Sequence, residues 1–192
     1  MSKIGIFAGT FDPVHHGHIT FAHAAIAQAG LNAVVFLPER APRRKTRVSS
    51  FEHRVQMLQL ATKNQPNLQV LTLGERQFTV AATLPQLQQR FKNDQLVLLV
   101  GSDVAAGLSA WQDLPQLAAS VGIAVGLRSG EHEQTMRDRL NVVDVPLRLQ
   151  FVHGNADHAA VTATDVRSGK LHLTAPTVRD YIMQHQLYGA TA

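Results

Sequence analysis

Short apolar segments alternate with helix-forming segments along almost the whole chain, and this alternation constrains the fold most strongly. Six of the segments are rich in Val, Leu and Ile and are apolar at nearly consecutive positions, which is typical of strands buried on both faces. Helical patterns separate them, so we expect a mostly parallel sheet. The predicted fold is α/β, an open Rossmann-like sheet with helices on both faces. The expected strands are 4–8, 33–37, 68–71, 96–100, 121–127 and 147–152.

Polar residues provide start signals for several of the helical segments. Ser49 and Glu52 have the spacing of a capping box, which predicts a helix from about residue 50. Thr174 followed by Pro176 is typical of a helix start and predicts the last helix. A chain of 192 residues can bury one sizeable core, so we expect a single domain over 1–192. The expected helices are 17–29, 50–63, 80–91, 114–119, 131–140 and 175–186.

Composition excludes several classes of protein. The chain has no cysteine, so neither a disulfide nor a thiolate metal site is available. It has no apolar run near the roughly 20 residues that a membrane span needs. The amino-terminal residues lead directly into the expected core strand 4–8, so we expect no signal peptide. We therefore expect a cytoplasmic protein with no membrane partner.

The net charge of +4 has a local origin. Five cationic side chains lie within residues 40–47, and without them the basic residues no longer outnumber the 14 acidic ones. Nucleic-acid-binding proteins usually spread basic groups over a face or a helix, so no nucleic acid partner is expected. A cationic loop could close over a triphosphate; a solvated surface loop is the alternative. The five residues are Arg40, Arg43, Arg44, Lys45 and Arg47.

The segment 9–19, Gly-Thr-Phe-Asp-Pro-Val-His-His-Gly-His-Ile, lies where the first strand leads into a helix. His15 and His18 flank Gly17, which permits close approach of backbone or ligand. A helix start offers unpaired N–H groups and a positive dipole end, and both suit phosphate. Neither a Walker loop nor the dinucleotide fingerprint is present. We interpret the segment as a phosphate cradle with two imidazole donors. A metal site on the two histidines and a simple helix cap are the alternatives.

Polar groups recur at other expected strand and helix ends. Asp103 follows the fourth strand, at the sheet edge where open α/β sheets bind ligands, and could accept hydrogen bonds from ribose or cap a helix. Trp111, the single tryptophan, could stack on a ring or fill the core. Thr162 and Thr164 could cap a helix and donate hydroxyls, while unpaired N–H groups at its start meet phosphates. Arg167, one turn on, could hold the same phosphates with its guanidinium fork.

Together these segments resemble one enzyme family. Residues 9–18 resemble the signature of the HxGH nucleotidylyltransferases, and residues 161–167 resemble their Ile-Ser-x-Thr-x-Ile-Arg motif. Residues 38–54 are similar to the Pro-rich basic loop and Glu-His-Arg helix of nicotinate-mononucleotide adenylyltransferases, with Arg44 where histidine is usual. Residues 178–188 resemble the closing helix of that family, and we interpret them as structural packing.

The resemblance implies an adenylyltransferase that joins AMP from ATP to a small phosphorylated acceptor and releases pyrophosphate. Nicotinate mononucleotide is the implied acceptor, and Mg²⁺ is expected on the substrate phosphates rather than in a protein site. Another acceptor, such as nicotinamide mononucleotide or phosphopantetheine, and a non-catalytic nucleotide-binding module are the alternatives. The implied catalytic residues are His15, His18 and Lys45; the nucleotide-binding residues are Gly9, Thr10, Phe11, Gly17, Thr162, Thr164 and Arg167; the acceptor-binding residues are Phe78, Thr79, Gly101, Asp103 and Trp111.

The chain departs from this family in segment 77–84. Relatives usually have Ser-Tyr-Thr-x-Asp-Thr-Leu there, whereas this chain has neither the tyrosine nor the aspartate. Because segment 77–84 has no acidic side chain, it suits an anionic ring at least as well as a neutral one. We therefore predict that kcat/KM favours the acid mononucleotide over the amide by at least about tenfold.

Overall fold

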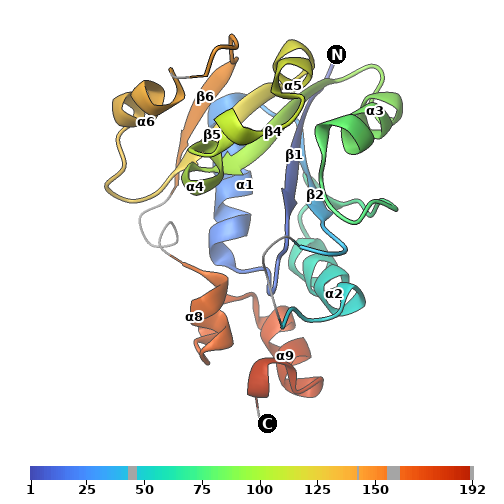
Figure 1. The fold of residues 1–192 in the computed structure, drawn as a ribbon. Helices are drawn as coiled ribbons and strands as arrows, with labels where there is room; N and C mark the ends of the chain where they lie inside the picture. The colour runs from blue at the N-terminus through green and yellow to red at the C-terminus, as the bar shows by residue number, and fades with distance from the viewer. Residues whose placement is uncertain (43–46, 142, 155–160, 191–192) are drawn as a thin grey trace.

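The computed structural model describes residues 1–42, 47–141, 143–154 and 161–190. Six strands form one sheet in the order β3-β2-β1-β4-β5-β6, and every neighbouring pair is parallel. This arrangement confirms the predicted open α/β sheet (Figure 1). Each strand lies within about two residues of its predicted range. The strands are β1 Lys3–Gly9, β2 Ala33–Pro38, β3 Leu68–Val70, β4 Gln95–Gly101, β5 Gly122–Leu127 and β6 Leu149–His153.

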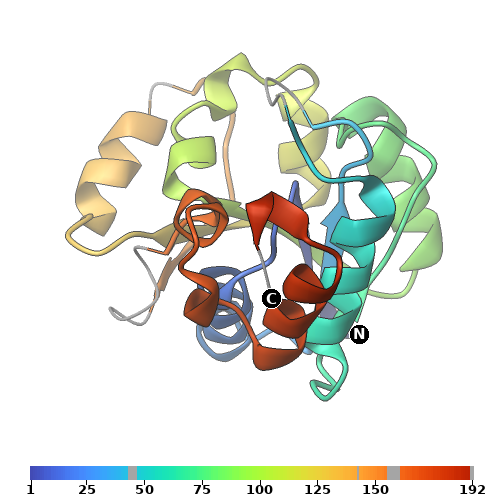
Figure 2. The same cartoon turned by 90° about the horizontal axis from the view of Figure 1, so that it is seen from below.

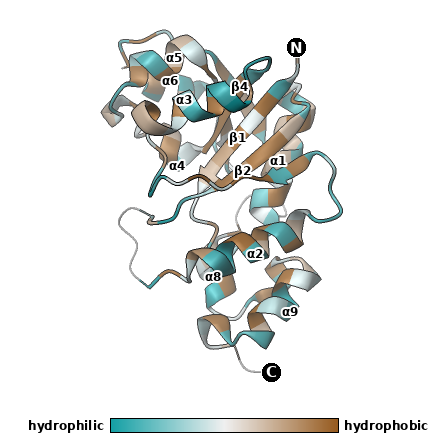
Figure 3. Cartoon of the chain, turned by 90° about the vertical axis from the view of Figure 1, so that its right-hand side faces the viewer, coloured by the Kyte–Doolittle hydropathy of each residue, from teal (hydrophilic) through white to brown (hydrophobic). Residues whose placement is uncertain are grey.

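Helices cover both faces of the sheet and enclose one apolar core on each. Successive side chains of a strand alternate between the cores; Val35 and Leu37 join one core, and Val34 and Phe36 the other. Figure 3 shows the apolar residues along β1 and β2. None of the helices within the described ranges is long and apolar enough to cross a bilayer. The helices are α1 His16–Ala29, α2 Phe51–Thr62, α3 Val80–Arg90, α4 Ser102–Ala105, α5 Leu114–Ser120, α6 Glu133–Leu140, α8 Ala163–Arg167 and α9 Pro176–Gln184, with short 3-10 turns η1 Leu108–Ala110, η2 Leu171–Leu173 and η3 Leu187–Gly189.

Local hydrogen bonds move two helix boundaries from their predicted places, and a left-handed backbone conformation moves a third. The cap of α2 is Ser50, whose hydroxyl accepts from the His53 N–H, so the predicted capping box at Ser49 is wrong by one residue. Helix α6 begins after residue 131 because the Glu131 carboxylate accepts from the Arg128 N–H and closes a turn. Helix α9 ends at Gln184, before the predicted 186, because Gln186 adopts a positive φ of 50°.

The strand order places the functional segments at one edge of the sheet. Strand β1 lies between β2 and β4. The chain turns toward one face of the sheet after β1 and toward the other face after β4. Open α/β sheets bind ligands at such a point. Helices α8 and α9 lie beyond this carboxyl edge, next to the loop that follows β1 (Figures 1 and 2).

Candidate active site

A pocket of about 430 Å³ opens at the carboxyl ends of β1, β4 and β5, between the starts of α1 and α8. It contains residues of both strong motifs, which are separated by more than 140 residues in the sequence. The fold therefore brings together the two segments that the sequence analysis assigned to phosphates. Its motif residues are His15, Gly17, His18, Thr162, Thr164 and Arg167, with Gly101, Asp103 and Arg128 on the remaining wall.

The two histidines begin helix α1. His18 Nδ1 accepts from the His15 backbone N–H at 3.2 Å, so a neutral His18 ring carries its proton on Nε2. The rings stack, with centroids 3.7 Å apart, and the side of His18 packs against Phe11 at 5.0 Å between centroids. These contacts fix the His18 ring and make its Nε2 an N–H donor.

His15 is more deeply buried than His18. It is 7% exposed, and its Nδ1 has no hydrogen-bond partner among the described residues. Burial, with a smaller contribution from His16, lowers the pKa of His15 to about 4, although Asp165 opposes the shift. His15 is therefore neutral near pH 7, and its Nδ1 is shielded from solvent.

The residues before the histidines form a tight turn. Phe11 adopts a positive φ of 50°, and its ring folds back onto Gly9, where an added Cβ would lie 3.1 Å from the ring. Thr10 is buried. An added side chain at position 9 would press on the Phe11 ring, so the turn favours glycine there.

Arg54 of α2 supports this turn from behind, a role that sequence reasoning missed. Its side chain is almost fully buried and donates to three carbonyl oxygens: Thr10 at 2.7 Å, Ser49 at 3.1 Å and Arg40 at 3.2 Å. Desolvation lowers the pKa of the guanidinium, and the three carbonyls compensate for its burial. Arg54 thus connects the loop after β1 to Arg40, at the start of the basic segment 40–47, and to Ser49, two residues after its end.

Asp12 connects the same turn to the carboxyl-terminal segment. Its carboxylate accepts from the Tyr188 hydroxyl at 2.7 Å and from the Ser49 N–H at 3.3 Å, and its carbonyl accepts from Arg167 at 2.6 Å. Burial and the bond to Asp12 raise the pKa of Tyr188. The segment 178–188 therefore has a second role besides packing, because it also contacts segment 9–19.

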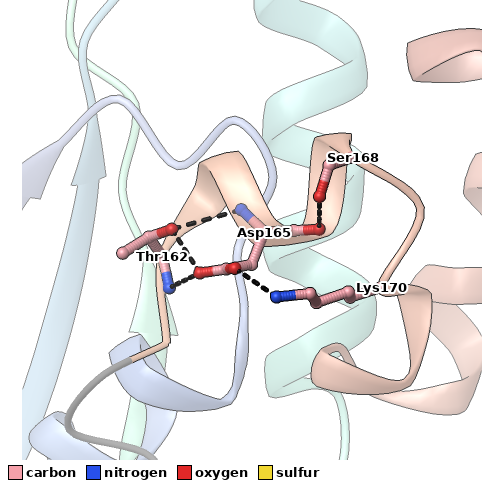
Figure 4. A network of polar contacts seen from close by, with 4 residues as sticks. All are labelled: Thr162, Asp165, Ser168 and Lys170. Carbon is pink, nitrogen blue, oxygen red and sulfur yellow. Dashed lines mark hydrogen bonds and ion pairs between the residues drawn. The ribbon is translucent and has the colours of Figure 1, made fainter.

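Helix α8 begins with a reciprocal capping box (Figure 4). The Thr162 hydroxyl accepts from the Asp165 N–H at 3.1 Å, and the Asp165 carboxylate accepts from the Thr162 N–H at 3.2 Å. This confirms Thr162 as the predicted cap and occupies two N–H groups at that helix start. Lys170, 2.8 Å from the carboxylate, is the main cause that lowers the pKa of Asp165 to about 2. The Thr164 hydroxyl accepts from Arg167 at 3.0 Å.

A second pocket, of about 340 Å³, adjoins the first and shares Phe7, Gly101 and Val104 with it. The rings of Phe78 and Trp111 lie 6.1 Å apart at its wall. Two of the residues expected on the acceptor do not line this second pocket. Asp103 faces the first pocket, where it pairs with Arg128 at 3.4 Å.

Thr79, the other of these two residues, caps α3: its hydroxyl accepts from the Ala82 N–H at 3.2 Å. Glu39 instead enters the second pocket, and it is the only charged side chain among the described residues that line it. Sequence reasoning missed Glu39 because it assigned the acceptor to residues of segments 77–84 and 101–111, whereas the contact of Glu39 with Phe78 spans 39 positions.

The centre of the basic loop, with Arg43, Arg44 and Lys45, lies outside the described residues. Arg40 does not face either pocket. Its guanidinium lies 4.3 Å from the centre of the Phe51 ring and donates to the Leu73 carbonyl at 3.0 Å. A role for the loop in covering a ligand stays a prediction.

The described residues contain no group of three or more potential metal ligands. Asp103 is the only carboxylate among the described residues that line the first pocket, between the starts of α1 and α8. A metal ion held entirely by side chains is therefore not supported in this part of the chain.

A more voluminous cavity of about 630 Å³ lies at the opposite edge, where β1, β4 and β5 begin. Half of its described lining residues are exposed, among them Met1, Lys92 and Arg148. It contains none of the motif residues, so we place the chemistry at the carboxyl edge in spite of the smaller volume there.

Comparison with known sequences shows which family this chain is similar to. The profile of the cytidylyltransferase-like family matches residues 6–169. A nicotinate-nucleotide adenylyltransferase of Bacillus subtilis is 39% identical over 153 residues, 76% of this chain and 79% of the relative. A probable nicotinate-nucleotide adenylyltransferase of Carboxydothermus hydrogenoformans is 30% identical over 197 residues, 97% of this chain and 98% of the relative.

Comparison with solved structures supports the fold. The nicotinic acid mononucleotide adenylyltransferase of Plasmodium falciparum, solved in complex with NaAD, superposes with a TM-score of 0.80 at 15% identity and covers 98% of each chain. A second structure of that protein, complexed with APC, gives a TM-score of 0.78. The whole sheet and its helices are therefore shared, despite low identity.

Proposed function

Because the chain belongs to the nicotinate-nucleotide adenylyltransferases of the cytidylyltransferase-like family, we propose that it transfers AMP from ATP to nicotinate mononucleotide. A phosphate oxygen of the acceptor attacks the α-phosphorus of ATP, the bond from that phosphorus to the β-phosphate oxygen breaks, and pyrophosphate leaves. The products are the deamido dinucleotide and pyrophosphate. One observation carries the proposal: two pockets, one with the phosphate-type motifs and one with aromatic walls, meet at Gly101 and Phe7.

The protein contributes position and charge rather than covalent chemistry. His18 donates from Nε2 to an α- or β-phosphate oxygen, and His15 lies beside it as a second imidazole. Arg167 already donates to Asp12 and Thr164, and a guanidinium has five N–H donors, so it retains donors for the leaving pyrophosphate. Lys45 is assigned to the same group, and Gly9, Thr10, Phe11, Gly17 and Thr162 shape the cradle.

Magnesium fits this site only through the substrate. With Asp103 as the one carboxylate among the described lining residues, the ion would take its oxygen ligands mainly from the phosphates and water, as Mg²⁺ commonly does. It would neutralise charge on the triphosphate.

A substrate panel tests the proposal. The purified protein is incubated with Mg²⁺, with ATP or CTP, and with nicotinate mononucleotide, nicotinamide mononucleotide or phosphopantetheine, and pyrophosphate release is measured. We expect release with ATP and nicotinate mononucleotide. Release only with phosphopantetheine would reassign the acceptor. No release in any combination, with ATP still bound, would support a non-catalytic nucleotide-binding protein.

A further inference from the structure

Phe7 lies at the point where the two pockets meet. It is third from the end of β1, is half-buried, and lines both the first and the second pocket. The two pockets also share Gly101 and Val104, so Phe7 is the one aromatic side chain among their described lining residues that faces both. In the proposed function, the acceptor phosphate and the α-phosphate of ATP come together where these pockets join. The Phe7 ring therefore lies beside the place assigned to the transfer.

Four other rings surround the ring of Phe7. Phe11 and Phe21 both meet it edge to face, with ring centroids 5.3 Å from that of Phe7. Phe36 lies opposite Phe7 in the register of β1 and β2, at 5.5 Å between centroids, and His18 lies at 5.8 Å. Edge-to-face pairs of this kind are favourable beyond the area that they bury. Phe7 is thus the centre of an aromatic cluster that includes one of the two motif histidines.

The neighbours of this cluster leave the Phe7 ring little room to move. Phe36 is fully buried in the core between the sheet and its helices. On another side, Phe21 packs so closely on Gly126 of β5 that an added Cβ there would lie 2.7 Å from the Phe21 ring. Both rings are therefore backed by rigid structure, and they fix the position of the Phe7 ring between them.

The orientation of His18 depends on such ring contacts. Its Nδ1 accepts one hydrogen bond from the His15 backbone N–H, and a single bond at that atom still allows the imidazole to tilt about it. The ring of His15 at 3.7 Å, Phe11 at 5.0 Å and Phe7 at 5.8 Å between centroids restrict this tilt. Of the two phenylalanines, only Phe7 also lines the pockets.

We propose that Phe7 is a positioning residue for AMP transfer, and that its ring holds the His18 imidazole in the orientation in which Nε2 donates to the transferred phosphate. A displacement of about 1 Å in such a group can cost up to about 10²-fold in rate. An unbranched or branched aliphatic side chain would fill part of the same space, but it has no aromatic ring to hold the imidazole. The inference rests on the proposed function and concerns the chemical step rather than the choice of acceptor.

Steady-state kinetics with ATP, Mg²⁺ and nicotinate mononucleotide test this role. Phe7→Leu and Phe7→Met both remove the ring and keep an apolar side chain. The matched control is Phe36→Leu, which removes a ring of the same cluster from a residue that does not line either pocket. Phe7→Leu is also measured in the His18→Ala background, and the urea midpoint of unfolding is measured for every variant.

We expect kcat to fall by about tenfold in Phe7→Leu and Phe7→Met, with the KM for both substrates within about threefold of wild type. Phe36→Leu should lower the urea midpoint at least as much, because it removes a fully buried ring, and should keep kcat within about twofold. In the His18→Ala background, Phe7→Leu should lower kcat by less than about twofold, because a residue that acts through His18 has no further effect once His18 is gone.

Two results would overturn the role of Phe7 in a wild-type protein that does transfer AMP. The first is a kcat in Phe7→Leu and Phe7→Met that is no lower than in Phe36→Leu, which would leave only the loss of packing. The second is a full tenfold fall that persists in the His18→Ala background, which would show that Phe7 does not act through His18. Failure of the wild-type protein to transfer AMP to any acceptor of the substrate panel would instead refute the proposed function, and this role with it.

Discussion

At the residue scale, His18 is a fixed N–H donor, and its loss should affect the chemical step. His18→Ala removes the group assigned to the charge that develops on the phosphates, so kcat should fall by about 10²–10³. The fold should survive, because His18 lies at the rim of a pocket and not in either core. The matched control is His23→Ala, an exposed histidine on the same helix. Wild-type turnover in folded His18→Ala would show that the active site is misplaced.

His15 should make folding stability depend on pH. Its folded pKa of about 4 lies below the ordinary 6.5, so the unfolded chain binds the proton more readily, and stability falls as the pH drops below 6.5. Urea unfolding should show a loss of about 2 kcal/mol between pH 7.5 and pH 5 in the wild type, relative to His15→Gln. If the free energy of unfolding changed with pH in the same way in both proteins, the result would contradict a buried, neutral His15.

Arg167 should act on the nucleotide and not on the acceptor. In Arg167→Ala the KM for ATP should rise by about tenfold or more, because a charge-assisted fork to phosphate is lost, while the KM for the acceptor changes little. Arg179→Ala, which removes an exposed arginine from α9, should leave both constants unchanged. A rise confined to the acceptor KM would reverse the orientation of the two substrates.

The sequence could identify residues whose role is local, and it could not identify those whose role depends on distant contacts. The spacing of His15 and His18 and the cap at Thr162 are properties of neighbouring residues. Arg54 and Tyr188 act through partners 44 and 176 positions away. Glu39 belongs with them, since its contact with Phe78 spans 39 positions.

At the element scale, apolar runs predicted the strands well because strands of a parallel sheet are buried on both faces. The short helix α4 and the turn η1 were not predicted, since four and three residues are too few for a helical period to be recognised. Helix α8 is also short, with five residues, but its capping box marks its start in the sequence. Element boundaries were the least predictable feature because single hydrogen bonds set them, as at Ser50 and Glu131.

The carboxyl-terminal segment should affect nucleotide binding through one hydroxyl. Tyr188→Phe leaves the buried Asp12 carboxylate with one fewer donor, which should lower the free energy of unfolding by about 1 kcal/mol and raise the KM for ATP severalfold. Tyr181→Phe is the matched control. It removes a hydroxyl of the same segment that bonds to His53 Nδ1 at 2.8 Å and not to the β1 loop.

Both variants should lose similar stability, and only Tyr188→Phe should change the KM for ATP. An equal change in the KM for ATP in the two variants, or no change in Tyr188→Phe, would show that the contact at Asp12 contributes to stability only and not to nucleotide binding.

At the scale of the whole molecule, the alternation of elements predicted a parallel sheet but not the order of its strands. That order, with β1 between β2 and β4, makes the carboxyl-terminal parts of β1 and β4, together with α4, the shared wall of two pockets. The sequence located the charge excess in segment 40–47, and the fold adds that Arg54 connects Arg40 at its start and Ser49 just after its end to the loop that follows β1.

The bond between Tyr188 and Asp12 also has a consequence for biosynthesis. Chains fold from their amino terminus as they are made, so β1 and segment 9–19 leave the ribosome long before Tyr188 has been synthesised. The donor that completes Asp12 lies 176 positions later. A nascent chain can therefore form most of the sheet while the Asp12 carboxylate still lacks the Tyr188 hydroxyl, and the complete set of Asp12 contacts arises only after residue 188 has been translated and has docked.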